Sequence, residues 1–129
     1  MGRAMTSTME VSSIHRLRFL APELRRGWTF PKITRDWRKR PLGRAFATVA
    51  IAGLRRRAPA VATRGIDRLS PYAMWVFHPV ITPRLVAVTK ARGVELVAWT
   101  VDDLPTMRRL ADLGVNGICT NDPRLFAEL

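Results

Sequence analysis

The segment from Val94 to Pro123 constrains the fold more than any other part of the sequence. It opens on Val94–Val101, a short apolar run rich in β-branched side chains, which is typical of a strand buried on both faces. Asp103 is followed by a leucine and a proline, and an acidic N-cap with a first-turn proline predicts a helix that begins there. Gly114 predicts the end of that helix, and a second apolar run, Val115–Thr120, follows it. The segment is therefore a predicted strand–helix–strand unit.

Strands and helices alternate through the rest of the chain. Strand-like segments precede this unit at Glu10–Ser13, Gly27–Phe30 and Met74–Phe77. Helical patterns separate them, over His15–Leu20, over a stretch from Leu42 to about Arg57 that Ala58-Pro59 should break, and from an N-cap at Thr82 to a stop at Gly93. This alternation predicts an α/β fold with parallel strands. The small, polar residues 1–9 are expected to form a disordered lead-in.

Length and composition limit the class of protein. At 129 residues and 47% hydrophobic content, the chain is long enough for one modest domain and too short for two. Its single cysteine, Cys119, excludes an internal disulfide, so nothing demands an oxidising compartment. The longest uncharged apolar run, Ala45–Leu54, falls short of the roughly 20 residues that a membrane-spanning helix needs. We therefore expect a cytoplasmic protein without a secretory signal or transmembrane segment.

Positive charge is concentrated in one region. The net charge is +12, and twelve Lys and Arg residues lie between Arg25 and Arg64 with Asp36 as the only acid among them. The simplest interpretation is a solvated helix face. A basic module that binds an anionic membrane or nucleic acid is the alternative. The side chains that it would use are Phe46, Val49 and Ile51 for the membrane, and Trp28 and Trp37 for nucleic acid.

Two motifs near the C-terminus are specific enough to indicate a family. Trp99–Asp102 reads WTVD, and Gly114–Pro123 reads GVNGICTNDP. They resemble the glycerophosphodiester phosphodiesterase family, whose late strands carry Trp-Thr-Val-Asn/Asp and whose end carries Gly-Val-Asp-Gly-Ile-(Ile/Val)-(Thr/Ser)-(Asp/Asn)-x-Pro. The upstream segments VSS and GWTFP fit the same family. The resemblance covers about 120 residues and is strongest after Thr82.

The resemblance implies a (β/α)₈ barrel that is only partly present. A complete barrel takes about 250 residues, roughly twice the length of this chain. Residues 10–129 are accordingly expected to form the C-terminal half of the barrel, with a basic helical connection at about 32–70. The strands assigned by the resemblance are Glu10–Ser13 as the fifth, Trp28–Phe30 as the sixth, Met74–Phe77 as the seventh and Leu96–Val101 as the eighth.

The resemblance also implies a reaction. Family members hydrolyse glycerophosphodiesters to glycerol 3-phosphate and an alcohol, in lipid and glycerol metabolism, with a divalent metal (Ca or Mg) and a pair of histidines. The His-Arg-Gly and Glu-x-Asp motifs that supply this chemistry belong to the first half of the family's barrel, and neither family position is filled here by His15 or His78. We therefore expect no catalytic or metal-binding residue in this chain, which as a truncated protein is predicted to be weak or inactive alone.

Completion of the barrel requires something besides this chain. A gene fragment, one half of a split enzyme joined by an N-terminal half chain, and a half-barrel that self-associates all fit the sequence. An open half-barrel would leave two sheet edges and an apolar face exposed, so a stable monomer would argue against it.

Trp99 and His78 are the candidate substrate-binding residues. Each stands at or just after the carboxyl end of a predicted strand, where active sites of this fold lie, and the family's tryptophan lines the substrate pocket there. Core packing is an equal alternative for Trp99, and a plain loop histidine is the favoured alternative for His78. Ser12 and Ser13 are weaker candidates for the same rim, and Cys119 is predicted to be a buried, inert thiol.

Overall fold

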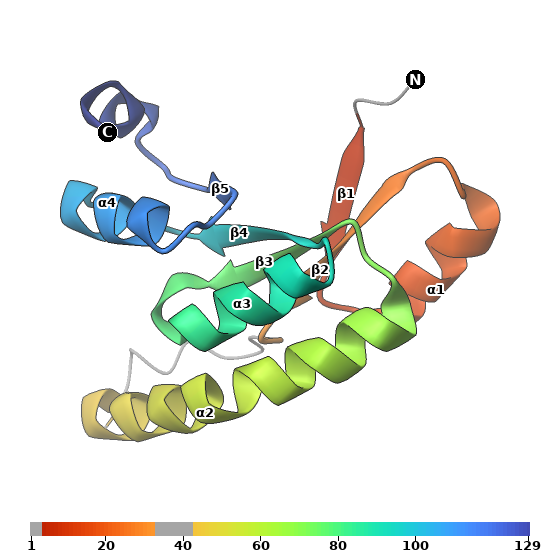
Figure 1. The fold of residues 1–129 in the computed structure, drawn as a ribbon, viewed down its shortest axis with the longest axis horizontal. Coiled ribbons are helices and arrows are strands. Elements are labelled where there is room, and N and C mark those ends of the chain that lie inside the picture. Colours follow the sequence, from red (N-terminus) through yellow and green to blue (C-terminus); the bar gives the residue numbers. More distant parts are fainter. Residues whose placement is uncertain (1–3, 33–42) are drawn as a thin grey trace.

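The computed structural model describes residues 4–32 and 43–129, and it is an α/β structure built on one parallel sheet (Figure 1). Residues 33–42, which hold part of the predicted basic connection and Trp37, lie outside the described residues. The strands are β1 (Met5–Thr8), β2 (Arg25–Phe30), β3 (Ala73–Phe77), β4 (Glu95–Trp99) and β5 (Gly117–Ile118). The helices are α1 (Val11–Leu20), α2 (Gly43–Leu69), α3 (Pro83–Ala91) and α4 (Leu104–Asp112), with 3₁₀ turns at His78–Val80 and Pro123–Glu128.

The sheet is open, with the strands in sequence order from β1 to β5 and every pair parallel. Register across the centre aligns Trp28 with Met74 and Met74 with Leu96. Parallel order with a helix in each of the four connections is the β/α arrangement that the alternating pattern predicted, and the predicted α/β class is confirmed.

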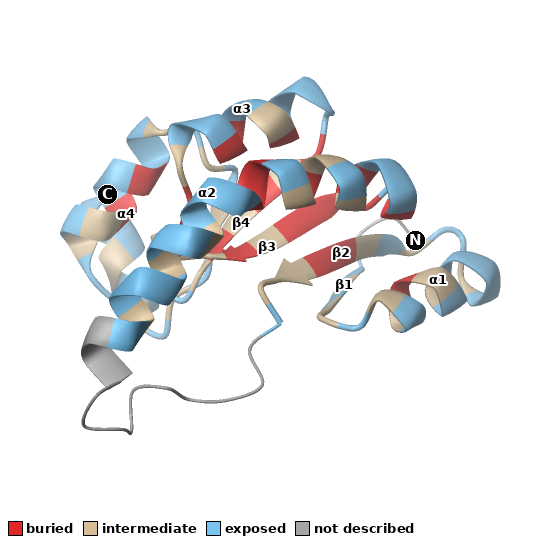
Figure 2. Cartoon of the chain, turned by 90° about the horizontal axis from the view of Figure 1, so that it is seen from below, coloured by how far each residue is buried: buried red, intermediate tan, exposed pale blue. Residues whose placement is uncertain are grey.

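One face of the sheet carries the hydrophobic core. Met74 and Val76 of β3, with Leu96 and Ala98 of β4, are completely buried in a cluster that also contains Ala62 of α2 and Leu85 of α3. Figure 2 shows the buried residues on the central strands and on the helix sides that cover them. Successive side chains of a strand point to opposite faces, so this covered face takes every second residue.

The other face, here called the open face, is formed by Trp75, Phe77, Val97 and Trp99. These four side chains are half-buried, and they alternate along β3 and β4 with residues of the core. Phe77 stacks against Trp99 with ring centroids 5.5 Å apart. Trp75 lies across Gly27, where a Cβ atom would come within 2.1 Å of its ring. In a closed barrel of parallel strands this face would point to the interior.

The predicted helix boundaries in the second half of the chain are confirmed. The Thr82 hydroxyl accepts a hydrogen bond from the backbone N–H of Leu85 (3.2 Å), and an Asp103 carboxylate oxygen accepts one from Thr106 (2.9 Å). Gly93 and Gly114 have φ angles of +64° and +88°, a conformation that favours glycine after a helix.

The first strand was predicted in the wrong place. Met5–Thr8, expected within the disordered lead-in, pairs with β2, whereas Glu10–Ser13 caps and begins α1. Val11 and buried Ile14 have the i, i+3 spacing of a helix face, which a four-residue reading could not separate from a strand. The described residues form five strands rather than the four assigned from the resemblance, because β5 lies in the Val115–Thr120 run of the predicted strand–helix–strand unit.

The predicted break at Ala58-Pro59 is also wrong, because α2 continues through Pro59 to Leu69. Both residues are buried, and the buried stripe continues through Ala62 and Ile66 at helical spacing. Proline inside a helix costs about 3 kcal/mol through its missing N–H and its ring. Burial of this stripe against the sheet outweighs that local cost.

Candidate functional site

The carboxyl ends of β3, β4 and β5 bring the sequence-predicted site residues to one edge of the sheet. In parallel α/β folds this edge carries the binding and catalytic groups. His78 begins the 3₁₀ turn that follows β3, and Trp99 is the last residue of β4. Thr120 follows β5. We call the loops at these strand ends the carboxyl rim.

Trp99 lies on the open face at this rim, outside the main core cluster. Its ring packs against Phe77, whose own ring centroid is 5.6 Å from that of His78. The indole Nε1–H of Trp99 is buried, and no acceptor in the described part of the chain lies within hydrogen-bond reach. A buried donor without an acceptor is costly, by about 1–3 kcal/mol. The Trp99 donor therefore favours an acceptor from outside the described residues.

The charge of His78 acts on a carboxylate that the sequence did not connect with it. Asp103, from the loop after β4, was interpreted only as a helix cap. The hydrogen bonds from Thr106, the backbone one first, hold the pKa of the Asp103 carboxyl below its ordinary 3.8, with smaller contributions from the charges of His78 and Arg109. His78 and Asp103 are separated by a whole β/α unit, so only the folded rim brings them together.

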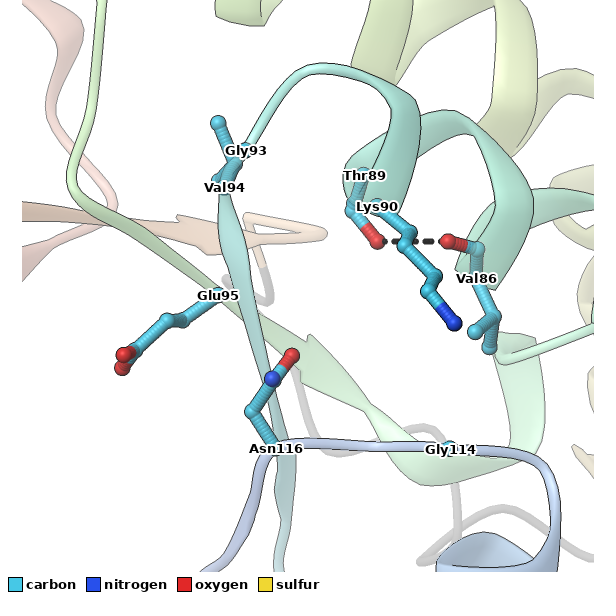
Figure 3. A pocket seen from close by; sticks show the side chains of 8 residues that line it. All are labelled: Val86, Thr89, Lys90, Gly93, Val94, Glu95, Gly114 and Asn116. Carbon is cyan, nitrogen blue, oxygen red and sulfur yellow. Dashed lines mark hydrogen bonds between the residues drawn. The ribbon is translucent and has the colours of Figure 1, made fainter.

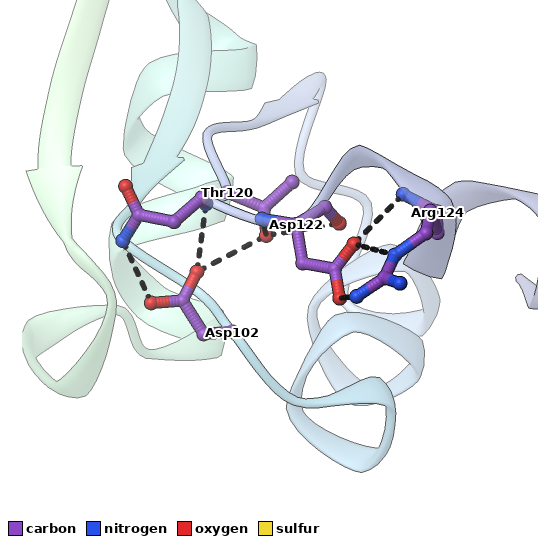
Figure 4. A network of polar contacts seen from close by, with 5 residues as sticks. Asp102, Thr120, Asp122 and Arg124 are labelled. Carbon is purple, nitrogen blue, oxygen red and sulfur yellow. Dashed lines mark hydrogen bonds and ion pairs between the residues drawn. The ribbon is translucent and has the colours of Figure 1, made fainter.

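Asp102 is the centre of a polar network that joins the β4 and β5 ends (Figure 4). One carboxylate oxygen accepts hydrogen bonds from the Thr120 hydroxyl (3.1 Å) and from the backbone N–H of Asn121 (2.8 Å). The other accepts from the side-chain amide of Asn121 (2.9 Å). Further along, Asp122 forms an ion pair with Arg124 at 2.8 Å. The two sequence motifs thus contact each other through their Asp/Asn positions.

These contacts predict a dependence on pH. The backbone and then the side-chain hydrogen bond of Asn121 hold the pKa of Asp102 below its ordinary 3.8. Because the pKa of Asp102 is lower in the folded chain than in the unfolded chain, its carboxylate stabilises the fold fully at any pH above the unfolded-chain pKa. This contribution declines as the pH falls below that value, and it is gone once the pH is below the folded-chain pKa. Asp102→Asn should therefore lower the melting temperature at neutral pH. Between pH 5 and pH 2 the melting temperature of the variant should decrease less than that of the wild type, as measured by circular dichroism.

An exchanged pair provides the control. In Asp102→Asn alone, the charge-assisted hydrogen bond at 2.9 Å is lost, and Asn121 must rotate its amide to present an acceptor to the new N–H₂ group. In the double variant Asp102→Asn, Asn121→Asp, the new amide can donate to the new carboxylate, while its oxygen still accepts from Thr120 and the backbone. We expect the double variant to regain most of the lost melting temperature. Equal losses in the single and double variants would contradict this account of the pair.

The structure does not place the weaker candidates at the rim as predicted. Ser12 and Ser13 lie in the first turn of α1, not at a strand end, and His15 lies half-buried in the same helix. Cys119, predicted to be buried, is exposed. Its place beside the two-residue strand β5 explains the error, because the sheet edge leaves that strand without a further neighbour on one side.

A hollow lies at the opposite end of the sheet, at the amino ends of β4 and β5. It has a volume of about 320 Å³, and Figure 3 shows that Lys90 of α3, Glu95 of β4 and Asn116 line it. Polar groups there are already used in the fold: Asn116 accepts from the backbone N–H of Leu96 at 2.9 Å, and Thr89 donates to the Val86 carbonyl at 3.0 Å. At the amino ends of barrel strands such contacts serve stability, so the rim is the better candidate site.

The described residues do not form a complete metal site. Between residues 4 and 32 and between 43 and 129, no three His, Cys, Asp or Glu side chains lie together. These groups alone therefore do not complete a site for the Ca or Mg that the resemblance implies. None of the helices in the same ranges combines the length and apolar character needed to cross a bilayer.

Comparison with known sequences gives a family match over nearly the whole chain. The model of the glycerophosphoryl diester phosphodiesterase family matches residues 1–125. A glycerophosphodiester phosphodiesterase of Arabidopsis thaliana is 46% identical over 54 residues, which are 42% of this chain and 16% of the relative. One from Caldanaerobacter subterraneus is 40% identical over 62 residues, which are 48% of this chain and 26% of the relative.

Solved structures agree on the fold. A putative glycerophosphoryl diester phosphodiesterase from Agrobacterium tumefaciens superposes with a TM-score of 0.72 and 17% identity, covering 98% of this chain and 43% of its own. A phosphodiesterase from Oleispira antarctica, solved with its product sn-glycerol-3-phosphate, superposes with a TM-score of 0.66 and 16% identity. The match covers 96% of this chain and 40% of the Oleispira chain. This chain thus spans less than half of either structure.

These neighbours are TIM-barrel proteins, so the open five-stranded sheet is part of such a barrel, as the sequence predicted. Homologues in the family generally use a divalent metal. The match over residues 1–125 shows that the chain belongs to the glycerophosphoryl diester phosphodiesterase family.

Proposed function

We propose that this chain supplies the substrate-contacting rim of a glycerophosphodiester phosphodiesterase. The observation that carries the proposal is the buried Nε1–H of Trp99, which faces no acceptor within the described residues at the edge where this fold binds ligands. A glycerophosphodiester offers phosphate oxygens for that donor and a glycerol skeleton for the indole ring. His78, beside Phe77 and within the field of Asp103, is a second polar contact for the phosphate.

Hydrolysis requires groups that this chain does not bring together. Cleavage of a phosphodiester needs its charge neutralised and its leaving alkoxide protonated, which calls for a metal with carboxylate ligands and a poised acid. The proposal assigns the Ca or Mg site and the histidine pair to an N-terminal part of the barrel. The truncated chain is then inactive alone. The proposal also places it in the cytoplasm, because its single cysteine requires no oxidising compartment.

Strand number favours an N-terminal part over self-association as the productive partner. A TIM barrel closes with eight strands, and this sheet has five. An N-terminal part that adds three strands would close the barrel between β5 and β1. Two copies of this sheet would bring ten strands, which does not reproduce the family's barrel.

A chimera tests the function directly. The part of the Caldanaerobacter relative that aligns with residues 70–129 of this chain is replaced by those residues, which include Trp75 and Trp99. We expect the chimera to hydrolyse glycerophosphocholine with Mg or Ca, and this chain alone to release no glycerol 3-phosphate. In the chimera, Trp99→Phe removes the N–H while it keeps an aromatic ring. We expect kcat/KM to fall at least about tenfold, since hydrogen bonds to charged groups are worth about 1.5–3 kcal/mol.

Trp75→Phe is the matched control, because Trp75 lies on the same open face at a distance from the rim. It should leave kcat/KM within about twofold, as expected for a side chain without ligand contact. A chimera that folds but is inactive, or equal effects of the two substitutions, would refute the assigned role of the rim. Hydrolysis by this chain alone would refute its predicted inactivity.

A further inference from the structure

Helix α2 presents an exposed surface that the barrel does not use. In Figure 2 its first turns project beyond the sheet, while its second half packs on the core. Phe46 and Val49 in the projecting part are 65% and 73% exposed. At 100° per residue, one outward strip contains Phe46, Val49, Gly53, Arg56, Arg57, Ala60, Arg64 and, near the C-terminal end of the helix, Asp67, all of them exposed. We call this strip the outward face of α2.

The outward face is apolar at one end and basic at the other. Phe46 and Val49 occupy the N-terminal end, and Arg56, Arg57 and Arg64 lie toward the C-terminal end. The helix length from Phe46 to Arg64 is about 27 Å. The one acid in the sequence of α2 is Asp67, near its C-terminal end, and its carboxylate pairs with Arg92. Among the described residues, no carboxylate pairs with the guanidinium groups of these arginines. The helix therefore offers net positive charge beside exposed apolar surface.

We propose that the outward face of α2 docks this protein on an anionic lipid surface. The chemistry matches that of interfacial helices, whose apolar side chains enter the headgroup boundary while Arg and Lys contact lipid phosphates. Each basic residue near such a surface contributes about 1 kcal/mol, and the cytoplasmic leaflet is anionic. The net charge of +12 adds a long-range attraction of the same sign.

The structure favours lipid over nucleic acid as the occupant. The nucleic-acid alternative used Trp28 as a stacking surface, but Trp28 is only 7% exposed, with its ring against Gly65 in α2. Interfaces with nucleic acid are polar and strongly charged, and they gain little from Val49. Burial of Phe46 and Val49 is favourable only against an apolar medium such as the acyl boundary.

Vesicle flotation at 0.15 M salt tests the proposal with the full chain. Wild-type protein should float with vesicles of 70% phosphatidylcholine and 30% phosphatidylserine, and not with phosphatidylcholine alone. Arg56→Ser with Arg57→Ser should weaken partitioning about thirtyfold, from the contribution of two arginines. Phe46→Ser with Val49→Ser should also weaken it at least about tenfold. These side chains are exposed, and circular dichroism melts should show that the variants remain folded.

Matched substitutions elsewhere locate the effect. Arg84→Ser with Arg109→Ser removes the same charge from exposed positions on α3 and α4. Phe19→Ser with Leu20→Ser removes apolar side chains that are 83% and 81% exposed on α1. Neither pair should change partitioning more than about threefold, as expected for positions away from the bilayer. Losses equal to those of the α2 variants, equal binding to neutral vesicles, or displacement of the protein from vesicles by duplex DNA would overturn the proposal. It does not depend on hydrolysis, because flotation requires no activity.

Discussion

Gly65→Ala is expected to destabilise the fold, although alanine is the better helix former. A Cβ atom at Gly65 would come within 2.2 Å of Cζ3 and 2.4 Å of Cη2 of Trp28. The Trp28 ring lies between β2 and α2 and is almost completely buried, so it has no open space into which to move. Overpacking of a core costs about 1–3 kcal/mol. We expect a melting temperature about 5–10 °C lower by differential scanning calorimetry.

Gly53→Ala in the same helix is the control with the opposite sign. No atom lies within 4 Å of a Cβ built at Gly53, which is exposed. Alanine should there stabilise the helix by about 0.5–1 kcal/mol through the unfolded state and helix propensity. Stabilisation by both substitutions would show that Trp28 does not pack on Gly65 in solution.

Local signals predicted the second half of the fold well. Thr82 and Asp103 cap their helices, and Gly93 and Gly114 end them, because each of these functions depends on backbone groups within four residues. Such contacts leave a signature in a short window of sequence.

Errors occurred where distant contacts decide the structure. Pro59 remains helical because the buried stripe of α2 packs on a sheet whose strands lie far along the chain. Met5–Thr8 becomes a strand only by pairing with β2, twenty residues later. Neither effect has a local pattern, and a short polar segment such as Met5–Thr8 has no apolar alternation to reveal it.

The sequence predicted where the candidate site lies in the sheet, but it did not predict the contacts within the site. Strand ends placed Trp99 and His78 at one rim, since the carboxyl ends of parallel strands share an edge. The contact of Asp102 with Asn121 and the electrostatic effect of His78 on Asp103 arise between separate loops. The register of β3, β4 and β5 determines which loops meet, and register depends on the whole sheet.

Substitution by lysine should have different effects on folding at two neighbouring positions of β4. Ala98 is fully buried under the helices, whereas Val97 is half-buried on the open face beside Gly117. Ala98→Lys places a charge in the core at a cost of several kcal/mol. That cost is a large part of the stability of about 5–15 kcal/mol typical of a domain. We expect no cooperative thermal unfolding transition for Ala98→Lys.

Val97→Lys should leave the isolated chain folded and change its association. The open face and the edges of β1 and β5, which pair with no further strand within the described residues, are expected to make the wild-type chain self-associate. Exposed apolar sheet surface and free edges both promote association. A lysine at position 97 adds charge to that face, so we expect the weight-average mass from light scattering to fall toward that of a single chain, 14.6 kDa. Closure of the barrel by an N-terminal part would enclose the same position, so Val97→Lys should then abolish assembly. Unfolding of the isolated chain by Val97→Lys, to the same extent as by Ala98→Lys, would mean that the face is already covered in solution.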